Sequence, residues 1–507
     1  MFQHLLSVMI FLPILAGLLL LMAPVSKKSA RIIGFGVSLA VLVLSFDVYT
    51  AFQATGVLEE VEIMRWIPSL GIAYHVGVDG ISLFIVMACA VLLPIVYVLF
   101  KTQAKGYYAN LLIVQGAMLG ALCAADIILF YVFWEIMLLP IFFMLGLYGG
   151  QKRIAATLKI TLYTIAGSLF MLASLIYIAT QYHAQTGVWS FAMSDIAMLD
   201  LSGQSAAIAL FGLMIAFAIK IPLFPFHTWL PDAYTEAPSA ATFVLSAIMA
   251  KIGVYGVIRL AVPVFEPEFA RYAILFAYSG LIGMLYCGIA AIAQKDCKRL
   301  VAFSSASHMG IIAVGVFSMN VQALTGTVYQ IVAHATSTGA LFLLLGLMEE
   351  RMQTRKISEL GGIAAKAPLF ALFFAIVMLA SVGLPGTSGF VGEFFIILGA
   401  LKFNILVGVL AGTAVIVGVC YMLWMFQRVF FEKSNAKTEQ FRDLTPAEGF
   451  ALLPIIVLIL LMGIYPHPFL QKIEPSTARQ FAVAKTVVAQ GSSQTTALPS
   501  EFTTEKN

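Results

Sequence analysis

Long apolar runs follow one another along most of the chain, and this feature limits the fold more than any other. A helix that crosses a bilayer needs about 20 mainly apolar residues, and the runs reach this length repeatedly. Only 11% of the 507 residues are charged, against about 25% in soluble domains, so polar residues are too few to cover a soluble fold. We therefore predict an all-α polytopic membrane protein.

The polar breaks between the apolar runs divide the chain into about fourteen predicted transmembrane helices. These cover residues 5–23, 32–52, 81–100, 108–125, 127–147, 158–180, 206–225, 240–262, 272–293, 300–317, 324–348, 369–401, 405–431 and 450–465. The last 42 residues contain few large apolar side chains, so we predict a polar, disordered C-terminal tail. The predicted units are 1–105 (three N-terminal helices), 106–262 and 263–431 (five helices each), 432–465 (a loop and the last span) and 466–507 (the tail).

The basic residues predict how the spans are oriented. With fourteen spans, 18 of the 29 lysines and arginines fall in the loops on one side, and only 3 fall in the loops on the other side. Because cytoplasmic loops are the ones enriched in basic residues, both termini are predicted to lie outside. Lys27, Lys28 and Arg31 follow the first apolar run, whereas a signal peptide carries its positive charges before that run. The first run is therefore predicted to be a retained span.

Several classes of function are disfavoured by the motifs. No dense basic strip is available to contact a phosphate backbone, which excludes nucleic-acid binding. The five cysteines are scattered, without a CxxC pair, so iron–sulfur and zinc sites are not expected. No dinucleotide-binding or P-loop motif occurs either. We expect no catalytic residue, no metal ligand and no bound cofactor in this chain; haem ligation by His308 and His334 remains an alternative without a second supporting motif.

Four charged residues lie deep within apolar runs, where they are costly. Each one costs about 2.5–3.5 kcal/mol at the centre of a membrane helix. They are Glu135, Lys220, Lys251 and Glu393. Two interpretations are open: ion pairs that lock helices together, or a path for ions. Lys159 and Arg259 lie near the ends of spans and are predicted to extend to the membrane interface.

Two of the predicted spans are interrupted beside these charges. Pro222 and Pro225 follow Lys220, while Pro385 and Gly386 precede Glu393. Proline removes a helical hydrogen bond and clashes with the preceding turn, so helices 7 and 12 are predicted to be discontinuous. Interrupted spans at corresponding places in two halves are typical of transporters built from repeats. We predict two inverted five-helix repeats, with a purely mechanical kink as the alternative.

Two histidines extend this series of polar residues within the spans. His308 and His334 lie in the predicted spans 10 and 11, and histidine exchanges protons near neutral pH. A proton relay is the favoured interpretation, and helix packing through hydrogen bonds is the alternative.

Three sequence blocks carry a resemblance to a known family. They are FYVFWEIMLLP (130–140), KIPLFPFHTWLPDAYTEAPSAATFVLSAIMAKIGVYG (220–256) and KDCKRLVAFSSASHMG (295–310). With these blocks the chain resembles the antiporter-like membrane subunits of respiratory complex I. The same family includes subunits of multisubunit sodium/proton antiporters and of membrane-bound hydrogenases. Within the family, the chain is most similar to the subunit type that has a glutamate in span 12 and no long lateral helix.

The resemblance implies a function and a set of residues. It implies a proton-translocating subunit of an NADH:quinone oxidoreductase in the bacterial inner (plasma) membrane, next to the antiporter-like subunits L and N. NADH, FMN, iron–sulfur clusters and quinone are then expected in partner subunits. The implied relay consists of Glu135, Lys220, Lys251, His308, His334 and Glu393. A stand-alone sodium/proton antiporter, a hydrogenase subunit and a membrane scaffold are the alternatives.

Overall fold

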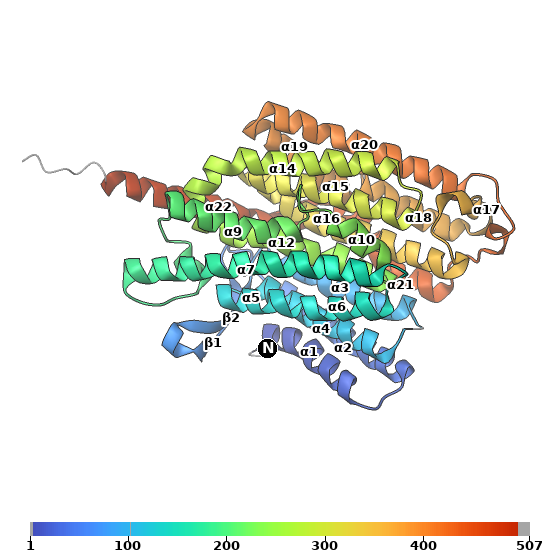
Figure 1. Cartoon of the computed structure of the whole chain (residues 1–507), viewed down its shortest axis with the longest axis horizontal. Coiled ribbons are helices and arrows are strands. Elements are labelled where there is room, and N and C mark those ends of the chain that lie inside the picture. The colour runs from blue at the N-terminus through green and yellow to red at the C-terminus, as the bar shows by residue number, and fades with distance from the viewer. Residues whose placement is uncertain (1–3, 102, 495–507) are drawn as a thin grey trace, which may run out of the picture.

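The computed structural model describes residues 4–101 and 103–494 and is a bundle of long helices that run roughly along one direction (Figure 1). The N-terminal part contains a two-stranded sheet and four helices: α1 (Leu5–Met22), α2 (Lys27–Ala51), β1 (Glu59–Ile67), β2 (Ile72–Val78), α3 (Leu83–Leu99) and α4 (Lys105–Cys123).

The middle part of the chain contains several short helices beside long ones. They are α5 (Ile127–Ile136), α6 (Leu138–Tyr148), α7 (Arg153–Thr186), α8 (Met193–Ile196), α9 (Gln204–Lys220), α10 (Trp229–Glu236), α11 (Ser239–Val244), α12 (Ala250–Gly256) and α13 (Val262–Val264). The C-terminal part contains α14 (Glu266–Ile292), α15 (Cys297–Phe317), α16 (Val321–Met352), α17 (Ile363–Lys366), α18 (Pro368–Ser381), α19 (Ser388–Phe403), α20 (Ile405–Phe430), α21 (Pro446–Ile464) and α22 (His467–Gln494).

The helices confirm the predicted fold class. Within residues 4–101 and 103–494, eleven helical segments are long and apolar enough to cross a membrane, and α3, α9 and α18 are shorter apolar helices. These segments lie at the apolar runs identified in the sequence. The number of fourteen spans, the inverted repeats and the outward orientation of both termini stay predictions.

The helices differ in how much of their surface other helices cover. α15, α16 and the stretch Ser239–Val264 are buried along their whole apolar windows, whereas only 28–33% of the windows of α2, α20 and α21 is buried. Many exposed positions of the outer helices carry large apolar side chains, such as Leu162 in α7 and Ile416 in α20. In a bilayer such side chains face lipid, so the central helices are the ones that can carry charge away from lipid.

A β-hairpin follows α2, in a segment between predicted spans for which no structure was expected. β1 pairs with β2 in antiparallel fashion, and Gly71 makes the turn with a φ of 70°. Glu62 in β1 accepts hydrogen bonds from the backbone N–H groups of Leu6 (2.7 Å) and Ser7 (3.3 Å). The first N–H groups of a helix have no partner within the helix, so this carboxylate anchors the start of α1.

The prediction of a disordered tail is wrong for residues 467–494, which form α22. The helix is attached by apolar and polar contacts: Ile473 is buried, and the Phe469 ring centre lies 5.1 Å from that of Phe84. Thr477 Oγ1 lies 2.7 Å from Thr325 Oγ1 of α16, and Ser476 Oγ accepts a hydrogen bond from Gly80 N at 2.9 Å. Because these contacts join segments that are distant in sequence, the composition of the tail gave no sign of them. Residues 495–507 lie outside the described residues.

The prediction that Arg259 extends to the membrane interface is also wrong. Its side chain is only 13% exposed and forms an ion pair with Asp79, which is 6% exposed. The guanidinium carbon also lies 5.1 Å from the centre of the Tyr255 ring. Asp79 precedes α3 in the chain, so its proximity to Arg259 depends on how the helices pack. Lys159, by contrast, is 35% exposed and pairs with Asp232 at 2.8 Å.

We predict that the Asp79–Arg259 pair stabilises the bundle. Arg259→Met should lower the free energy of unfolding by about 3–5 kcal/mol, because it leaves a buried carboxylate without its partner. The double variant Asp79→Asn/Arg259→Met removes both charges and should recover most of that loss. Thermal unfolding of the detergent-purified protein measures both. Equal losses in the two variants would contradict a role for the pair.

Candidate functional site

Lys220 ends α9 and points into the protein interior. Pro222 cannot continue the helix, so Lys220 is the last helical residue. Its side chain is buried, and Nζ lies 4.6 Å from the centre of the Trp134 ring in α5. A cation held over an indole face is stabilised by the ring electrons. Trp134 was not identified from the sequence, although it directly precedes Glu135.

Glu135 lies next to this cation and is not bonded to it. Among the described residues, no ion pair within 4.0 Å joins Glu135 to Lys220, and Glu135 Oε1 has no hydrogen-bond partner. Glu135 directly follows Trp134 in α5, so its backbone lies next to the ring that holds the Lys220 ammonium group. Because no ion pair among the described residues fixes Glu135 to Lys220, the interaction between the two charges can change when α5 moves slightly.

The gap between α9 and α10 is held by hydrogen bonds to its free backbone groups. The Trp229 indole N–H donates to the carbonyl of Ile219 (2.8 Å), and Ser279 Oγ donates to the carbonyl of Phe224 (2.6 Å). Unpaired backbone groups at membrane depth are tolerated only where protein or internal water satisfies them. The interrupted helix is therefore a stable part of the fold.

Lys251 is fully buried in α12, between two π-helical segments. Its ammonium group donates to the carbonyl of Ser246, which lies in the first of these segments (Leu245–Met249). π-helical turns inside α-helices are frequent at functional sites. Gly253 lets α12 approach the end of α9: a Cβ atom added there would lie only 3.1 Å from Lys220 Cβ. The two lysines are thus carried by helices in close contact.

His308, His334 and Glu393 form a second group on α15, α16 and α19. The two imidazole rings have centroids 5.6 Å apart, and His308 Nε2 lies 3.6 Å from Glu393 Oε1. His308 Nδ1 is 2.8 Å from the carbonyl oxygen of Ser304. Both nitrogens of His308 therefore face protein oxygens, an arrangement that does not fit an axial haem ligand. Neither nitrogen of His334 has a partner among the described residues.

The second helix break makes room for Glu393. Gly383 lies in the gap between α18 and α19 with a φ of +71°, and a Cβ atom there would lie 2.6 Å from Glu393 Oε2. The other carboxylate oxygen, Oε1, accepts a hydrogen bond from Gln330 Nε2 at 3.1 Å. Gln330 was missed in the sequence, although it lies one helical turn before His334 and so shares its face.

The structure thus brings the six candidate residues into two groups with Lys251 between them. Trp134, Glu135 and Lys220 form the first group, and α12, which carries Lys251, packs against α9 of this group and against α15 of the second. Apart from Glu135 and His308, each of these residues has an exposed fraction of at most 4%. A series of titratable groups through a water-excluded bundle is chemically suited to passing protons from one group to the next.

The chain is similar to proteins of one family over most of its length. Residues 124–418 match the family described as "NADH:quinone oxidoreductase/Mrp antiporter, TM". NADH-quinone oxidoreductase subunit M of Rickettsia prowazekii is 37% identical over 478 residues, which cover 92% of this chain and 96% of the relative. NADH-ubiquinone oxidoreductase chain 4 of Arabidopsis thaliana is 35% identical and covers 93% and 96% of the two chains.

Two solved structures have a similar fold. A chain of respiratory complex I from Thermus thermophilus with bound NADH has a TM-score of 0.87 and 33% identity, and the match covers 94% of this chain and 99% of that one. A chain of the Mrp complex from Dietzia sp. has a TM-score of 0.84 at 21% identity, with 96% and 99% covered. At 21% identity, the similarity to the Mrp chain shows a shared fold only.

The contact between Gly383 and Glu393 can be tested against a matched glycine. Gly383→Ala and Gly386→Ala both place a side chain at positive φ, which costs roughly 1–2 kcal/mol. Around Gly386 the space is open, whereas at Gly383 the new Cβ meets Glu393. We expect Gly383→Ala to lower the thermal unfolding temperature clearly more than Gly386→Ala. Equal losses would show that Glu393 is not fitted against this turn.

Proposed function

The chain belongs to the NADH:quinone oxidoreductase/Mrp antiporter family, and from this membership we propose that it is a proton-translocating membrane-arm subunit of an NADH:quinone oxidoreductase. Its relatives at 35–38% identity carry names of subunits of that enzyme. The chain is accordingly part of a multisubunit respiratory enzyme in a membrane. Of the subunit types, M fits best, because the bacterial relatives bear that name over nearly their whole length.

The observation that carries this proposal is the set of buried charged groups beside two broken helices. A scaffold would gain nothing from an ammonium group held over Trp134 without a paired carboxylate. Nor would it need a carboxylate fitted against Gly383 and within 3.6 Å of His308. Replacing such buried charges by apolar side chains is often neutral or stabilising for a fold. Their presence therefore supports a role in moving protons.

Glu135 would control when Lys220 releases its proton. Two unit charges at an effective dielectric of 20 interact by about 4 kcal/mol at 4 Å and by about 2.4 kcal/mol at 7 Å. A movement of the carboxylate by roughly 3 Å would thus change the proton affinity of the lysine about 20-fold. The released proton would pass to Lys251, then to His308 and His334, and reach Glu393 before it leaves on the outer side.

The energy for this transfer would come from partner subunits. NADH, FMN, the iron–sulfur clusters and quinone would be bound there, and this chain would hold no redox centre. Antiporter-like subunits L and N would be its neighbours in the membrane arm. The bacterial relatives support a location in the plasma membrane. The excess of basic residues in one set of loops supports an orientation with both termini outside.

We predict that the two central lysines are required for pumping. Lys220→Met and Lys251→Met should each lower NADH-driven proton uptake by inverted membrane vesicles, normalised to NADH oxidation and to the amount of assembled complex. Lys159→Met is the control: its ion pair with Asp232 is 35% exposed and is worth about 0–1 kcal/mol at most, so uptake should stay unchanged. Undiminished uptake in both central variants would overturn the relay.

A second measurement separates this function from that of a sodium/proton antiporter. Proton uptake driven by NADH should be the same when sodium is replaced by potassium or choline in the assay buffer, because no step of the relay needs a metal cation. Without NADH, a sodium gradient should drive no proton exchange through this chain. Sodium-driven exchange that is lost in Lys220→Met would favour the antiporter instead.

A further inference from the structure

A cavity of about 280 Å³ lies where the short helices α10 and α11 meet α15 and α16. It is at the end of the bundle that the loop charges predict to be cytoplasmic. Three carboxylates line it, together with two basic residues: Glu236, Glu349, Glu350, Lys298 and Arg355. The volume is far greater than one water molecule needs, and the excess of carboxylates favours positively charged species.

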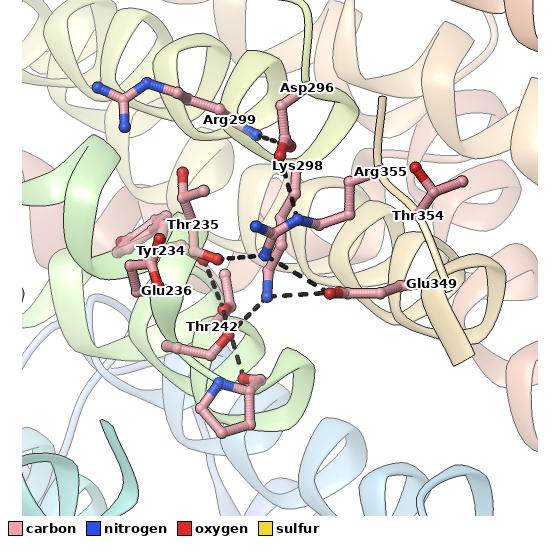
Figure 2. Close-up of polar contacts among 12 residues, drawn as sticks. Tyr234, Thr235, Glu236, Thr242, Asp296, Lys298, Arg299, Glu349, Thr354 and Arg355 are labelled. Carbon is pink, nitrogen blue, oxygen red and sulfur yellow. Dashed lines mark hydrogen bonds and ion pairs between the residues drawn. The ribbon is translucent and has the colours of Figure 1, made fainter. Parts of the chain in front are cut away.

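Lys298 closes the inner side of this cavity. Lys298 lies just before the predicted span 300–317 and is therefore one of the 18 predicted loop charges, but its side chain is only 3% exposed. Its ammonium group donates to the carbonyl of Ala237 at 2.5 Å and lies 3.9 Å from Glu349 Oε2 (Figure 2). Arg355 approaches the other oxygen of Glu349 at 3.5 Å and donates to the carbonyl of Thr235 at 2.7 Å. Lys298 thus lies between the cavity and the interior.

Ala237, which receives this hydrogen bond, is located between the two central lysines along the chain. It joins α10, which follows the break after Lys220, to α11, which leads to Lys251. Lys298 also lies in the first turn of α15, ten residues before His308, which corresponds to about 15 Å along the helix. The buried amine therefore contacts the segment that joins the two lysine-bearing parts of the chain, and it lies on the helix that carries His308.

Two buried hydroxyl groups lie further inward and lack a protein partner. They are Tyr234 Oη of α10 and Ser305 Oγ of α15, and neither is hydrogen-bonded among the described residues. The Tyr234 ring packs 5.7 Å from Phe342, two helical turns before Glu349 on α16. Buried polar groups without protein partners are commonly bonded to internal water, and water can carry a proton over such a gap.

We propose that this cavity is the proton-uptake site of the chain, and that Lys298 passes protons from it to the interior. This inference rests on the proposed function. In each cycle the Lys298 ammonium group gives one proton to water held at Tyr234 and Ser305. The resulting amine then takes one proton from hydronium in the cavity, by way of Glu349. The neutral amine keeps two N–H bonds, so it can still donate to the carbonyl of Ala237.

A charged thiol label placed in the cavity tests the uptake site. Ser239 lines the cavity wall and Gln353 lines its exposed rim, so Ser239→Cys and Gln353→Cys are made in a Cys420→Ser background, since the other four cysteines are buried. A membrane-impermeant methanethiosulfonate bearing a quaternary ammonium group is added to inverted vesicles. Labelling should lower proton uptake per NADH oxidised, because it fills the cavity and adds positive charge.

The matched control is Glu439→Cys, which is exposed on the loop between α20 and α21 and should be labelled without effect on uptake. Mass spectrometry measures the extent of labelling in each variant. Full labelling of the cavity cysteines with unchanged uptake would overturn the proposal. Failure to label either of them would also overturn it, because the cavity would then be closed to the cytoplasmic solution.

Substitution of Lys298 separates proton transfer from a merely structural contact. Lys298→Arg keeps the positive charge and the hydrogen-bond donors, but arginine does not release a proton in proteins. We expect it to lower uptake per NADH oxidised about tenfold or more, as expected when a proton-transferring group is removed. Lys298→Met should do the same. Arg299→Lys, which changes the neighbouring, more exposed residue, should leave uptake unchanged.

If Lys298→Arg shows wild-type proton uptake and the complex assembles normally, Lys298 has only a structural role and the proposal is overturned. Its failure is distinguishable from failure of the proposed function. If Lys220→Met abolishes uptake while the labelled cavity and Lys298→Arg leave it intact, only the uptake site is wrong. If Lys220→Met itself pumps normally, the relay fails as a whole.

Discussion

The cost of placing a charge in a bilayer is the constraint on which the rest of this structure depends. A single charged side chain at the centre of an isolated membrane helix costs several kcal/mol, so such groups persist only where other helices shield them from lipid. Here the outer helices are apolar towards their exposed side, and the charged side chains lie on the central ones. Lys251 shows the result: it is fully buried and donates to a backbone carbonyl.

The helix breaks follow from the same constraint. A regular helix uses all its carbonyls internally and leaves no polar group for a buried cation. π-helical turns and proline interruptions place carbonyls and side-chain donors at membrane depth, as at Ser246 beside Lys251 and at Trp229 beside the end of α9. At Glu393 the break works through shape instead, because the glycine turn leaves space for a carboxylate. The irregular segments are thus the places where charge can be accommodated.

Much of the fold and of the site could be predicted from local sequence signals. Apolar length identified the spans, and charges within apolar runs identified Glu135, Lys220, Lys251 and Glu393 without reference to any partner. What was missed involves contacts between distant segments. Asp79 lies 180 residues from Arg259 in the chain, and α22 is attached through residues of α16 and the loop before α3. The burial of Lys298 depends on the connection between α10 and α11, which lies against it in the fold. From the sequence alone, Lys298 is therefore a loop charge.

The sequence by itself determined that this protein lies in a membrane, which helices are interrupted, and which few residues carry charge where charge is expensive. Those properties depend on residue type and spacing along one helix, so they can be read locally. Only the tertiary structure decided how the charges are grouped. It placed Lys220 over Trp134 with no ion pair to a carboxylate in the part of the chain that the structure describes, and it set His308 between His334 and Glu393. It also buried Lys298, which the sequence places in a loop. Distances between side chains on different helices depend on helix packing, which residue type and spacing within one helix do not specify.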